Sequence, residues 1–234
     1  MQINKFILHH YPATRSVRVR WILQETVGDK FEVRRVELYE GAQYNSDYLI
    51  FNPNHSVPML EIHWEDGSVQ HMLESVAMVE WLADQYPEKE LCPRPENGAR
   101  RAGYLQQTMH FAGTWLDMML WQIRIHTHIL PSDEIDQKTL DRYRGKFIDD
   151  GEPQILARLN KHKYILGDQF SAADCIMGHI VFWAKAYDLC RDERFDAYVA
   201  TLMQRDSLAK SLDDLATFQI APEKNQSIVQ HFNG

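Results

Sequence analysis

Residues 57–75 read VPMLEIHWEDGSVQHMLES and carry the clearest structural signal in the chain. Apolar residues recur through 57–62 and again through 69–73, and Glu65-Asp66-Gly67 between them is typical of a hairpin turn. We therefore expect two strands joined by a tight turn. The proline at the start removes a backbone donor, so either this is a plain strand start or edge, or the Val57–Pro58 bond is cis. An X–Pro bond costs only ~0.5–1 kcal/mol to place in cis.

A cis bond at this position would have a use. It would leave the N–H and C=O of Val57 facing outward, where an extended peptide ligand can pair with them as an added strand.

The flanking sequence extends this unit in both directions. The predicted order is β-α-β, loop, β-β-α. Its elements are a strand over 5–9, a helix over 16–27 that Gly28 ends, a strand over 31–38, a polar loop over 41–54 with a short helix, the hairpin, and a helix over 76–86 that Pro87 stops.

The rest of the chain has no strand pattern. Residues 87–97 contain three prolines and five charges and indicate a linker. Helices are expected over 98–128, over 136–162 with a kink or split at Gly145, Gly151 and Pro153, over 171–189, and in shorter pieces to about 215, followed by a polar tail from 218 to 234. Within the first of these helices, Met118, Met119, Leu120 and Trp121 are expected in the core.

Composition narrows the function classes. The chain of 234 residues carries a net charge of −8, which argues against nucleic acid or an anionic membrane as a partner. Its three cysteines form no CxxC pair, so a reducing compartment is expected. The first ten residues lack the pattern of a signal peptide, and no apolar run reaches the ~18 residues that span a membrane. Together these features predict a cytoplasmic protein.

Glu74-Ser75 stands where the last helix of the first unit begins. One reading is a plain N-cap, worth ~1 kcal/mol. The other is a ligand site, because a helix N-terminus offers free N–H donors to a carboxylate, and Glu74 offers a counter-charge to an ammonium. A ligand with both groups on one carbon is an amino-acid head group, such as the γ-glutamyl end of glutathione.

The turn Tyr11-Pro12-Ala13-Thr14-Arg15-Ser16 joins the first strand to the first helix. Thr14 or Ser16 can serve as a helix cap, or the turn can activate a thiol. A free thiol with a pKa near 8.5 is only ~3% thiolate at pH 7. A hydroxyl donor, a helix N-terminus and the nearby Arg15 or Arg18 each favour the anion.

Two further patterns have structural readings. Ser171-Ala172-Ala173-Asp174 matches a capping box at the start of a buried helix, a folding signal and not a catalytic pair. His9-His10 and His126-Thr127-His128 have close spacing, but no third or fourth ligand follows in a recognised pattern. No metal site is therefore expected.

These motifs together resemble the cytosolic glutathione transferases over nearly the whole chain. That family carries Val-Pro before its third strand, Glu/Gln-Ser at the next helix, and Ser-x-x-Asp in a buried helix of its second domain. The chain is most similar to the bacterial and fungal group with a Ser-Arg-Ser-x-Arg motif, which here reads Thr14-Arg15-Ser16-Val17-Arg18. In the stretch 111–116 the family's Glu is Gly113, which weakens any expected contact from this helix to glutathione across a dimer interface.

The resemblance implies a fold with an α/β part and an all-α part. A thioredoxin-like glutathione-binding domain would span 1–86, a linker 87–97 and an all-helical bundle domain 98–234.

The resemblance also implies roles for particular residues. Val57 would pair with the cysteinyl backbone of glutathione, and Pro58 would shape the turn that presents it. Glu74 and Ser75 would hold the γ-glutamyl group. His55 would lie near the glycine carboxylate, and Arg15 near the thiol. Serine-type members place their hydroxyl where this chain has Ala13, so the activating hydroxyl is Thr14 first, Ser16 second and Tyr11 third. The electrophile pocket would use Tyr104, Met109, His110, Phe111 and Trp115, although a core or dimer-face role is an equal alternative for each.

The implied activity is glutathione transfer in detoxification: a bound glutathione thiolate, with glutathione as co-substrate, attacks a small apolar electrophile or a peroxide. A homodimer is implied as well. The alternatives are a non-catalytic transferase-like binding or regulatory module and a glutathione-dependent disulfide reductase. The first cysteine, Cys92, lies far from the turn at 11–16, which argues against mixed-disulfide chemistry.

Overall fold

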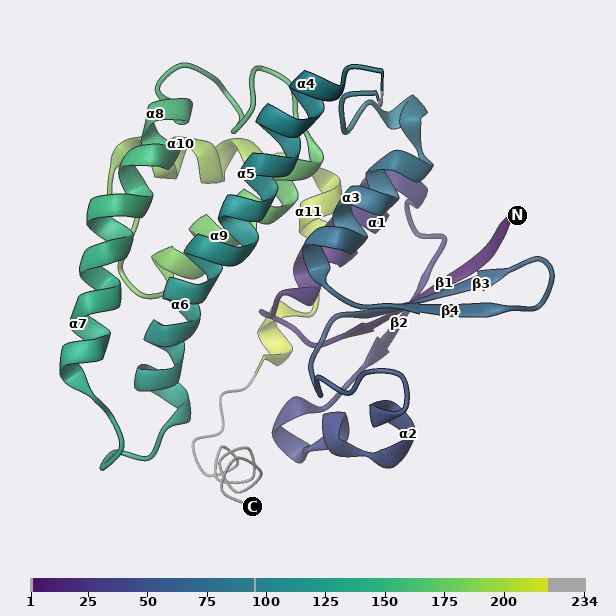
Figure 1. Ribbon diagram of the computed structural model, residues 1–234, viewed down its shortest axis with the longest axis horizontal. Coiled ribbons are helices and arrows are strands. Elements are labelled where there is room, and N and C mark those ends of the chain that lie inside the picture. The colour runs from purple at the N-terminus through teal and green to yellow at the C-terminus, as the bar shows by residue number, and fades with distance from the viewer. Residues whose placement is uncertain (1, 95, 219–234) are drawn as a thin grey trace. The chain divides into compact units, whose positions relative to one another are not determined.

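The computed structural model describes residues 2–94 and 96–218 (Figure 1). The chain divides into two compact units. One contains the chain up to Leu82 together with the segment from Ser207 onward, and the other contains Ala83–Asp206.

The first unit is built on a four-stranded sheet in the order β2-β1-β3-β4. Its strands are β1 (Ile3–His10), β2 (Glu32–Arg35), β3 (Met59–Trp64) and β4 (Val69–Met72). β1 pairs in parallel with β2 and antiparallel with β3, and β3 pairs antiparallel with β4. Along the chain, a β-α-β half is followed by a β-β-α half. Together with the mixed sheet, this order is the thioredoxin-like arrangement expected from the sequence.

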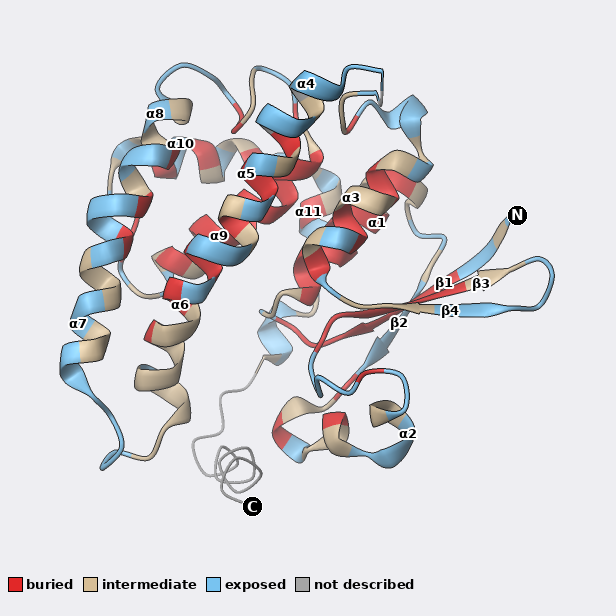
Figure 2. Ribbon diagram, in the orientation of Figure 1, coloured by how far each residue is buried: buried red, intermediate tan, exposed pale blue. Residues whose placement is uncertain are grey.

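Helices cover both faces of this sheet. Helix α1 (Ser16–Val27) and helix α3 (Ser75–Gln85) lie on one face, and the short α2 (Ser46–Leu49) lies on the other (Figure 1). The α1 side chains Trp21, Ile22 and Leu23 are fully buried, which explains the apolar spacing of this helix in the sequence (Figure 2). Gly28, at φ +62°, ends α1 as predicted.

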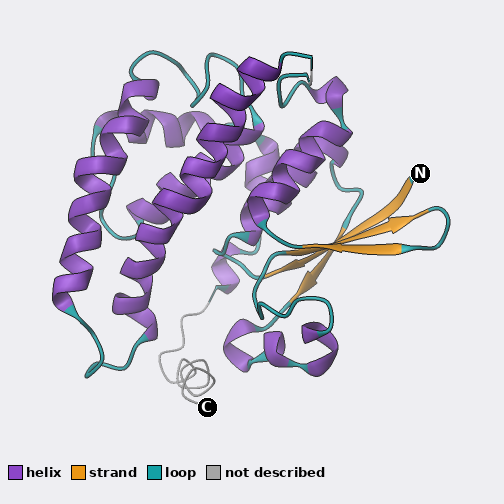
Figure 3. Ribbon diagram, viewed as in Figure 1, coloured by secondary structure: helices purple, strands orange, loops and turns teal. Residues whose placement is uncertain are grey.

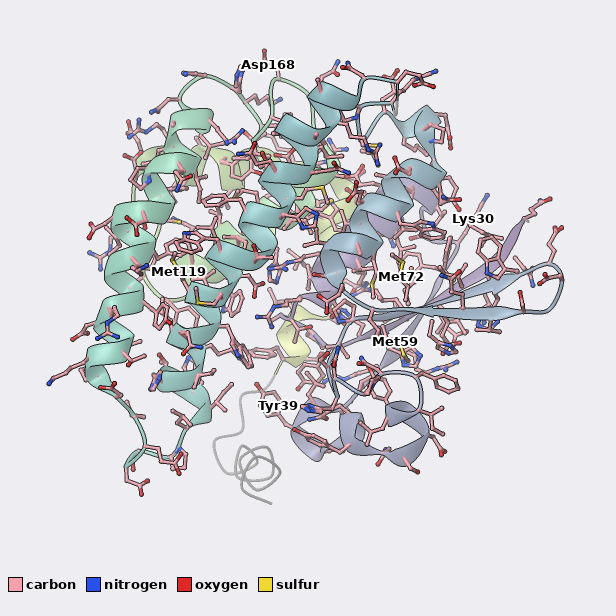
Figure 4. All side chains as sticks on the ribbon, in the orientation of Figure 1. Lys30, Tyr39, Met59, Met72, Met119 and Asp168 are labelled. Carbon is pink, nitrogen blue, oxygen red and sulfur yellow. The ribbon has the colours of Figure 1, made fainter. Side chains whose placement is uncertain are left out.

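Two strand predictions need correction. The second strand was expected over 31–38 but covers only Glu32–Arg35. Beyond it the chain forms 3-10 turns at Leu38–Glu40 and Ala42–Tyr44, on either side of Gly41 at φ +79°. The third strand begins at Met59 (labelled in Figure 4) and not at Val57, because Pro58 has no N–H to add to the ladder.

The second unit consists of helices, as expected (Figure 3). A continuous helical stretch covers 98–129, with α-helical and π-helical turns in alternation, and a second covers 137–159. The α-helices are α4 (Gly98–Arg100), α5 (Gln107–His110), α6 (Asp117–Arg124), α7 (Gln137–Lys146), α8 (Glu152–Leu159), α9 (Ala172–Lys185) and α10 (Glu193–Leu202). The π-helical pieces are Arg101–Gln106, Phe111–Leu116, Ile125–Ile129 and Phe147–Gly151.

The helix predicted to kink or split near Gly151 does not split: it continues through a π-helical turn at Phe147–Gly151. A Cβ at Gly151 would come within 2.8 Å of Cδ2 of Leu116, so glycine lets these two helical stretches pack closely, and a larger residue would displace the end of the Leu116 side chain. Met119 and Leu120 are buried as predicted, Trp121 is half-buried, and Met118 is exposed, so the core prediction is wrong for Met118.

The capping box at α9 is confirmed. Ser171 is the N-cap, and Asp174 bonds back to its backbone N–H at 2.9 Å. The Asp174 carboxylate is fully buried and also accepts from the N–H of Ile165 at 2.9 Å and from the hydroxyl of Tyr198 at 2.7 Å. It therefore ties the start of α9 to a loop and to α10.

The segment that follows the second unit returns to the first. It contains α11 (Asp206–Ser211) and a 3-10 turn at Leu215–Thr217. Its contacts with the first unit recur along its length: Ser207 with Glu25, Lys210 with Asp29, Asp213 and Asp214 with Arg20, Thr217 with Arg35, and Phe218 with Tyr11 and Tyr39. Residues 219–234, most of the predicted polar tail, lie outside the described part of the chain.

Candidate functional site

The turn between β1 and α1 brings the candidate hydroxyl groups of Thr14 and Ser16 together. The Oγ atoms of these two residues are 2.7 Å apart. Thr14 Oγ1 is also 2.7 Å from the carbonyl oxygen of Tyr11 and accepts from the N–H of Ser16 at 3.3 Å. Thr14 is partly exposed, whereas Ser16 is fully buried, so Thr14 is the hydroxyl of this pair that a ligand can reach.

Ser16 lies at the centre of a buried polar network. Its Oγ is 2.7 Å from Nδ1 of His10 and accepts from the N–H of Tyr11 at 3.2 Å. His10 is itself fully buried, and its Nε2 lies 3.1 Å from Oδ2 of Asp214. Burial lowers the pKa of His10, although the bond to Asp214 acts in the opposite direction.

Tyr11 occupies a different environment from the other candidate hydroxyl residues. Its side chain is buried in a small apolar cluster with Val36, Tyr39 and Val57. The Tyr11 ring meets that of Tyr39 edge-on, with ring centres 5.7 Å apart (Tyr39 is labelled in Figure 4), and the guanidinium of Arg35 lies 4.9 Å from its centre. The ring thus supports the turn that carries Val57.

The Val57–Pro58 peptide bond is cis, as the sequence suggested. In the part of the chain that the structure describes, neither the N–H nor the C=O of Val57 takes part in a hydrogen bond, and strand pairing starts only at Met59. The preceding carbonyl, that of Ser56, accepts from the amide of Asn52 at 2.7 Å and the hydroxyl of Tyr48 at 2.6 Å. Burial raises the pKa of Tyr48 to about 12, so this hydroxyl stays a donor.

Glu74 and Ser75 stand at the N-terminus of α3, as predicted. The carbonyl of Glu74 accepts the first helical hydrogen bond, from the N–H of Met78 at 3.0 Å. Ser75 is buried, while Glu74 is exposed. The buried Arg18 donates from Nη1 to Oγ of Ser75 at 3.3 Å and so joins α1 to the start of α3. Sequence reasoning placed Arg18 only near the thiol and missed this link.

Three of the six described non-glycine residues with positive φ stand at these positions. Ala13 has φ +54°, His55 has φ +42° and Glu74 has φ +71°. Such values are uncommon for residues other than glycine and concentrate at ligand sites. Each of the three stands beside one of the predicted glutathione contacts, in the turn at 11–16, before Val57 and before Ser75.

Two other predicted contacts are placed at the surface of the same unit. His55 is exposed, and its ring is tilted against that of Tyr44, with centres 5.0 Å apart. Arg15 is partly exposed and immediately precedes α1. Both are therefore accessible to a ligand, and their roles remain predictions.

The predicted electrophile-pocket residues belong to the second unit. His110 and Trp115 are exposed and Phe111 is half-buried, whereas Met109 is fully buried in the helical core. The ammonium of Lys146 lies 5.1 Å from the centre of the Trp115 ring. Tyr104 lies in the π-helical turn at Arg101–Gln106, and its side chain is outside the described part of the structure.

Neither the cysteines nor the histidines of the described residues form a disulfide or a metal centre. Cys92, Cys175 and Cys190 take no part in a disulfide bond. Burial, followed by the neighbouring Asp84, raises the pKa of Cys92 to about 11, so this thiol is protonated at neutral pH. Among residues 2–94 and 96–218, no group of three or more His, Cys, Asp or Glu side chains is arranged to hold a metal ion.

Comparisons with known proteins find similar sequences and similar folds. Residues 14–85 match the family model for the glutathione S-transferase N-terminal domain. The chain is 31% identical to glutathione S-transferase GstB of Escherichia coli K12 over 142 residues, which cover 61% of this chain and 65% of that protein. It is 28% identical to maleylacetoacetate isomerase of Dictyostelium discoideum over 194 residues, or 81% of this chain and 84% of that protein.

The fold also has solved counterparts. A glutathione transferase from Burkholderia graminis, crystallised with two glutathione molecules per subunit, superposes with a TM-score of 0.76 at 23% identity, covering 89% of this chain and 88% of that one. No helix within the described ranges is long and apolar enough to cross a lipid bilayer.

Proposed function

We propose that the chain is a member of the glutathione S-transferase family that binds glutathione and activates its thiol for attack on an electrophilic or peroxide substrate. The observation that carries the proposal is the open backbone of Val57. Its N–H and C=O are free of hydrogen bonds in the described chain, so they can pair with the backbone of the cysteinyl residue of the tripeptide. Titration calorimetry with glutathione tests this, and absence of binding would refute it.

The two ends of the tripeptide have matching groups on the same unit. The free N–H groups at the start of α3, with Ser75, suit the γ-glutamyl carboxylate, and the exposed Glu74 suits its ammonium. His55 can donate a hydrogen bond to the glycine carboxylate, and Arg15 offers a positive charge near the thiol. With the γ-glutamyl end at α3, the thiol is directed to Thr14, the partly exposed hydroxyl in the turn before α1.

Replacing Ser75 by alanine is expected to weaken glutathione binding by ~1–3 kcal/mol, because a donor to the carboxylate is lost and the buried Arg18 loses a partner. Calorimetry measures the affinity, and the melting curve reports any loss of folding. Ser68→Ala, in the exposed hairpin, is the matched control and should bind normally. If Ser75→Ala binds glutathione as tightly as the unaltered protein does, Ser75 is not part of the site.

The second substrate is proposed to be a small apolar electrophile. Support comes from the aromatic side chains of Phe111 and Trp115, which are accessible at the surface of the helical unit, with His110 beside them as a polar group. Such sites combine apolar walls with a few polar groups that orient the ligand. The isomerase among the relatives widens the range of glutathione-dependent reactions to be assayed.

A homodimer is proposed as the working assembly. Large apolar side chains are exposed in each unit: Ile50 (73%) and Phe51 after α2, and Met118 and Ile148 on the helices. Apolar surface of this kind is typical of subunit interfaces. The interface would also remove these side chains from water.

Ile50→Glu is expected to weaken the dimer by tenfold or more, because a charge would be buried without a partner at a cost of about 1–3 kcal/mol. Light scattering coupled to size-exclusion chromatography measures the assembly. Met203→Glu, at another exposed apolar residue, is the control and should remain dimeric. A monomeric parent protein, or an Ile50→Glu variant that dimerises normally, would contradict the proposed interface.

One observation favours a non-catalytic module as the second candidate. Ala13 is exposed at the point where serine-type transferases carry their hydroxyl, and Thr14 already contacts Tyr11 and Ser16. Such a module need not bind glutathione, so failure of the protein to be retained on immobilised glutathione would favour it. The proposed transferase would be retained and would conjugate a model electrophile.

A further inference from the structure

A continuous series of hydrogen-bonding groups runs from the candidate thiol site into the core of the first unit. Thr14 Oγ1 lies 2.7 Å from Ser16 Oγ, which lies 2.7 Å from His10 Nδ1, and His10 Nε2 lies 3.1 Å from Asp214 Oδ2. Thr14 is partly exposed, and Ser16 and His10 have no exposed surface. Asp214 comes from the segment that returns after the second unit, 204 residues from His10 in sequence.

The chemistry of the Asp214–His10 pair determines the direction of the hydrogen bond between them. An ionised carboxylate only accepts, so Nε2 of His10 carries a proton toward Asp214. Burial favours the neutral ring, which leaves Nδ1 as an acceptor for the Ser16 hydroxyl. The carbonyl oxygen of Tyr11 also lies within hydrogen-bond distance of both hydroxyl groups, 2.7 Å from Thr14 and 3.0 Å from Ser16. In the arrangement that a relay requires, Ser16 donates to Nδ1, its oxygen accepts from Thr14, and the Thr14 oxygen accepts from a ligand thiol.

We propose, on the basis of the proposed glutathione site, that the Asp214–His10 pair accepts the thiol proton through the hydroxyl groups of Thr14 and Ser16. The S–H bond breaks as Thr14 takes its proton, Thr14 passes its own proton to Ser16, and Ser16 passes its own to Nδ1 of His10. The products are a thiolate and an imidazolium, with no atom gained or lost. The hydrogen bonds between the thiol and Nδ1 of His10 persist with their directions reversed, so Thr14 now donates to the thiolate, while Nε2 of His10 still donates to Asp214.

The charges around His10 bear on this step. Asp214 stabilises the imidazolium from the returning segment, while Arg20 on α1 and Arg35 on β2 oppose it. Arg20 is paired with Asp213 at 2.7 Å and with Asp214 at 3.1 Å, and Arg35 with Glu37 at 2.5 Å, which reduces their effect. Because burial disfavours an isolated imidazolium, the proton moves together with formation of the thiolate, whose negative charge offsets it.

Counting protons tests the step directly. Glutathione is added to the full-length protein in weakly buffered solution with a pH indicator, while ultraviolet absorbance counts the thiolate formed. S-methylglutathione, which has no thiol, corrects for protons released by binding alone. If His10 keeps the proton, clearly less than one proton is released per thiolate. Release of one proton per thiolate by the unaltered protein would overturn the proposal.

Variants identify the acceptor. In His10→Asn, whose amide can still bond to Ser16 but takes up no proton, we expect one proton released per thiolate and a thiolate midpoint about one pH unit higher, or about tenfold less thiolate at a given pH. Asp214→Asn should shift both measurements in the same direction by less. Asp213→Asn removes the same charge from the adjacent, 60% exposed residue that has no contact with His10, and should behave as the parent protein does.

The outcomes separate the two proposals. If glutathione does not bind the parent protein, the proposed function fails. If glutathione binds and forms a thiolate, but His10→Asn and Asp214→Asn leave the proton count and the midpoint unchanged, only the relay fails. Melting curves accompany each variant, and Asp214→Asn, the milder change in a partly exposed residue, keeps the test decisive should His10→Asn not fold.

Discussion

Thr14→Val is expected to lower the rate of glutathione conjugation about 10- to 100-fold, because a hydrogen bond from a hydroxyl to a charged group contributes ~1.5–3 kcal/mol. Valine has nearly the same shape as threonine, so the backbone turn can persist. Thr14 is the partly exposed hydroxyl in this turn, and Ser16 cannot reach a ligand from its buried position. The thiolate midpoint in an absorbance titration should rise with the loss of rate.

Thr14→Ser is the control for this prediction, because it keeps the hydroxyl and loses only a methyl group. It should retain most of the activity and the midpoint of the parent protein. The same midpoint in Thr14→Val and the parent protein would assign the role to Ser16 or Tyr11. For Tyr11 the hydroxyl would then have to act from within its apolar cluster, which a Tyr11→Phe variant would examine.

Asp174→Ala is expected to lower the free energy of unfolding by about 3–5 kcal/mol and the melting temperature by on the order of 10 °C. The fully buried carboxylate accepts from the N–H groups of Ile165 and Ser171, and from the hydroxyl groups of Ser171 and Tyr198. Removing it leaves these buried donors without their acceptor and also abolishes the capping box at α9.

Chemical denaturation followed by circular dichroism measures this loss. Asp168→Ala is a suitable control, because that carboxylate is 82% exposed (Asp168 is labelled in Figure 4). Its Oδ1 lies 3.9 Å from Nδ1 of His162, which is a long distance for an ion pair. It should change the free energy of unfolding by less than ~0.5 kcal/mol. Equal stability of Asp174→Ala and the parent protein would mean that the network around α9 does not stabilise the fold.

Much of the fold was predictable because its signals are local. Helix α1 was expected over 16–27 and is observed over that range, since its apolar spacing and Gly28 both act within one element. The second strand was predicted too long. Val36 and Leu38 alternate as they would in a strand, but they pack in the small apolar cluster around Tyr11, and a 3-10 turn begins at Leu38. Gly151 was interpreted as a kink, whereas it provides room for Leu116 on another helix.

The site divides in the same way. Val57-Pro58, Glu74-Ser75 and the capping box are short motifs whose chemistry follows from adjacent residues, and the structure shows the predicted cis bond and helix starts. His10 was considered only as part of a histidine pair, because its partner Asp214 is 204 residues away. The bond from Arg18 to Ser75 likewise depends on the packing of α1 against the start of α3, which no local pattern encodes.

The return of residues 207–218 to the first unit has a consequence for biosynthesis. Arg20, His10 and Arg35 each rely on a partner from that segment, so the thioredoxin-like unit lacks those contacts while the chain is still being translated. On the ribosome, residues 207–218 therefore complete a unit whose strands were synthesised earlier, and a nascent chain stalled before residue 207 should expose a protease-sensitive thioredoxin-like unit.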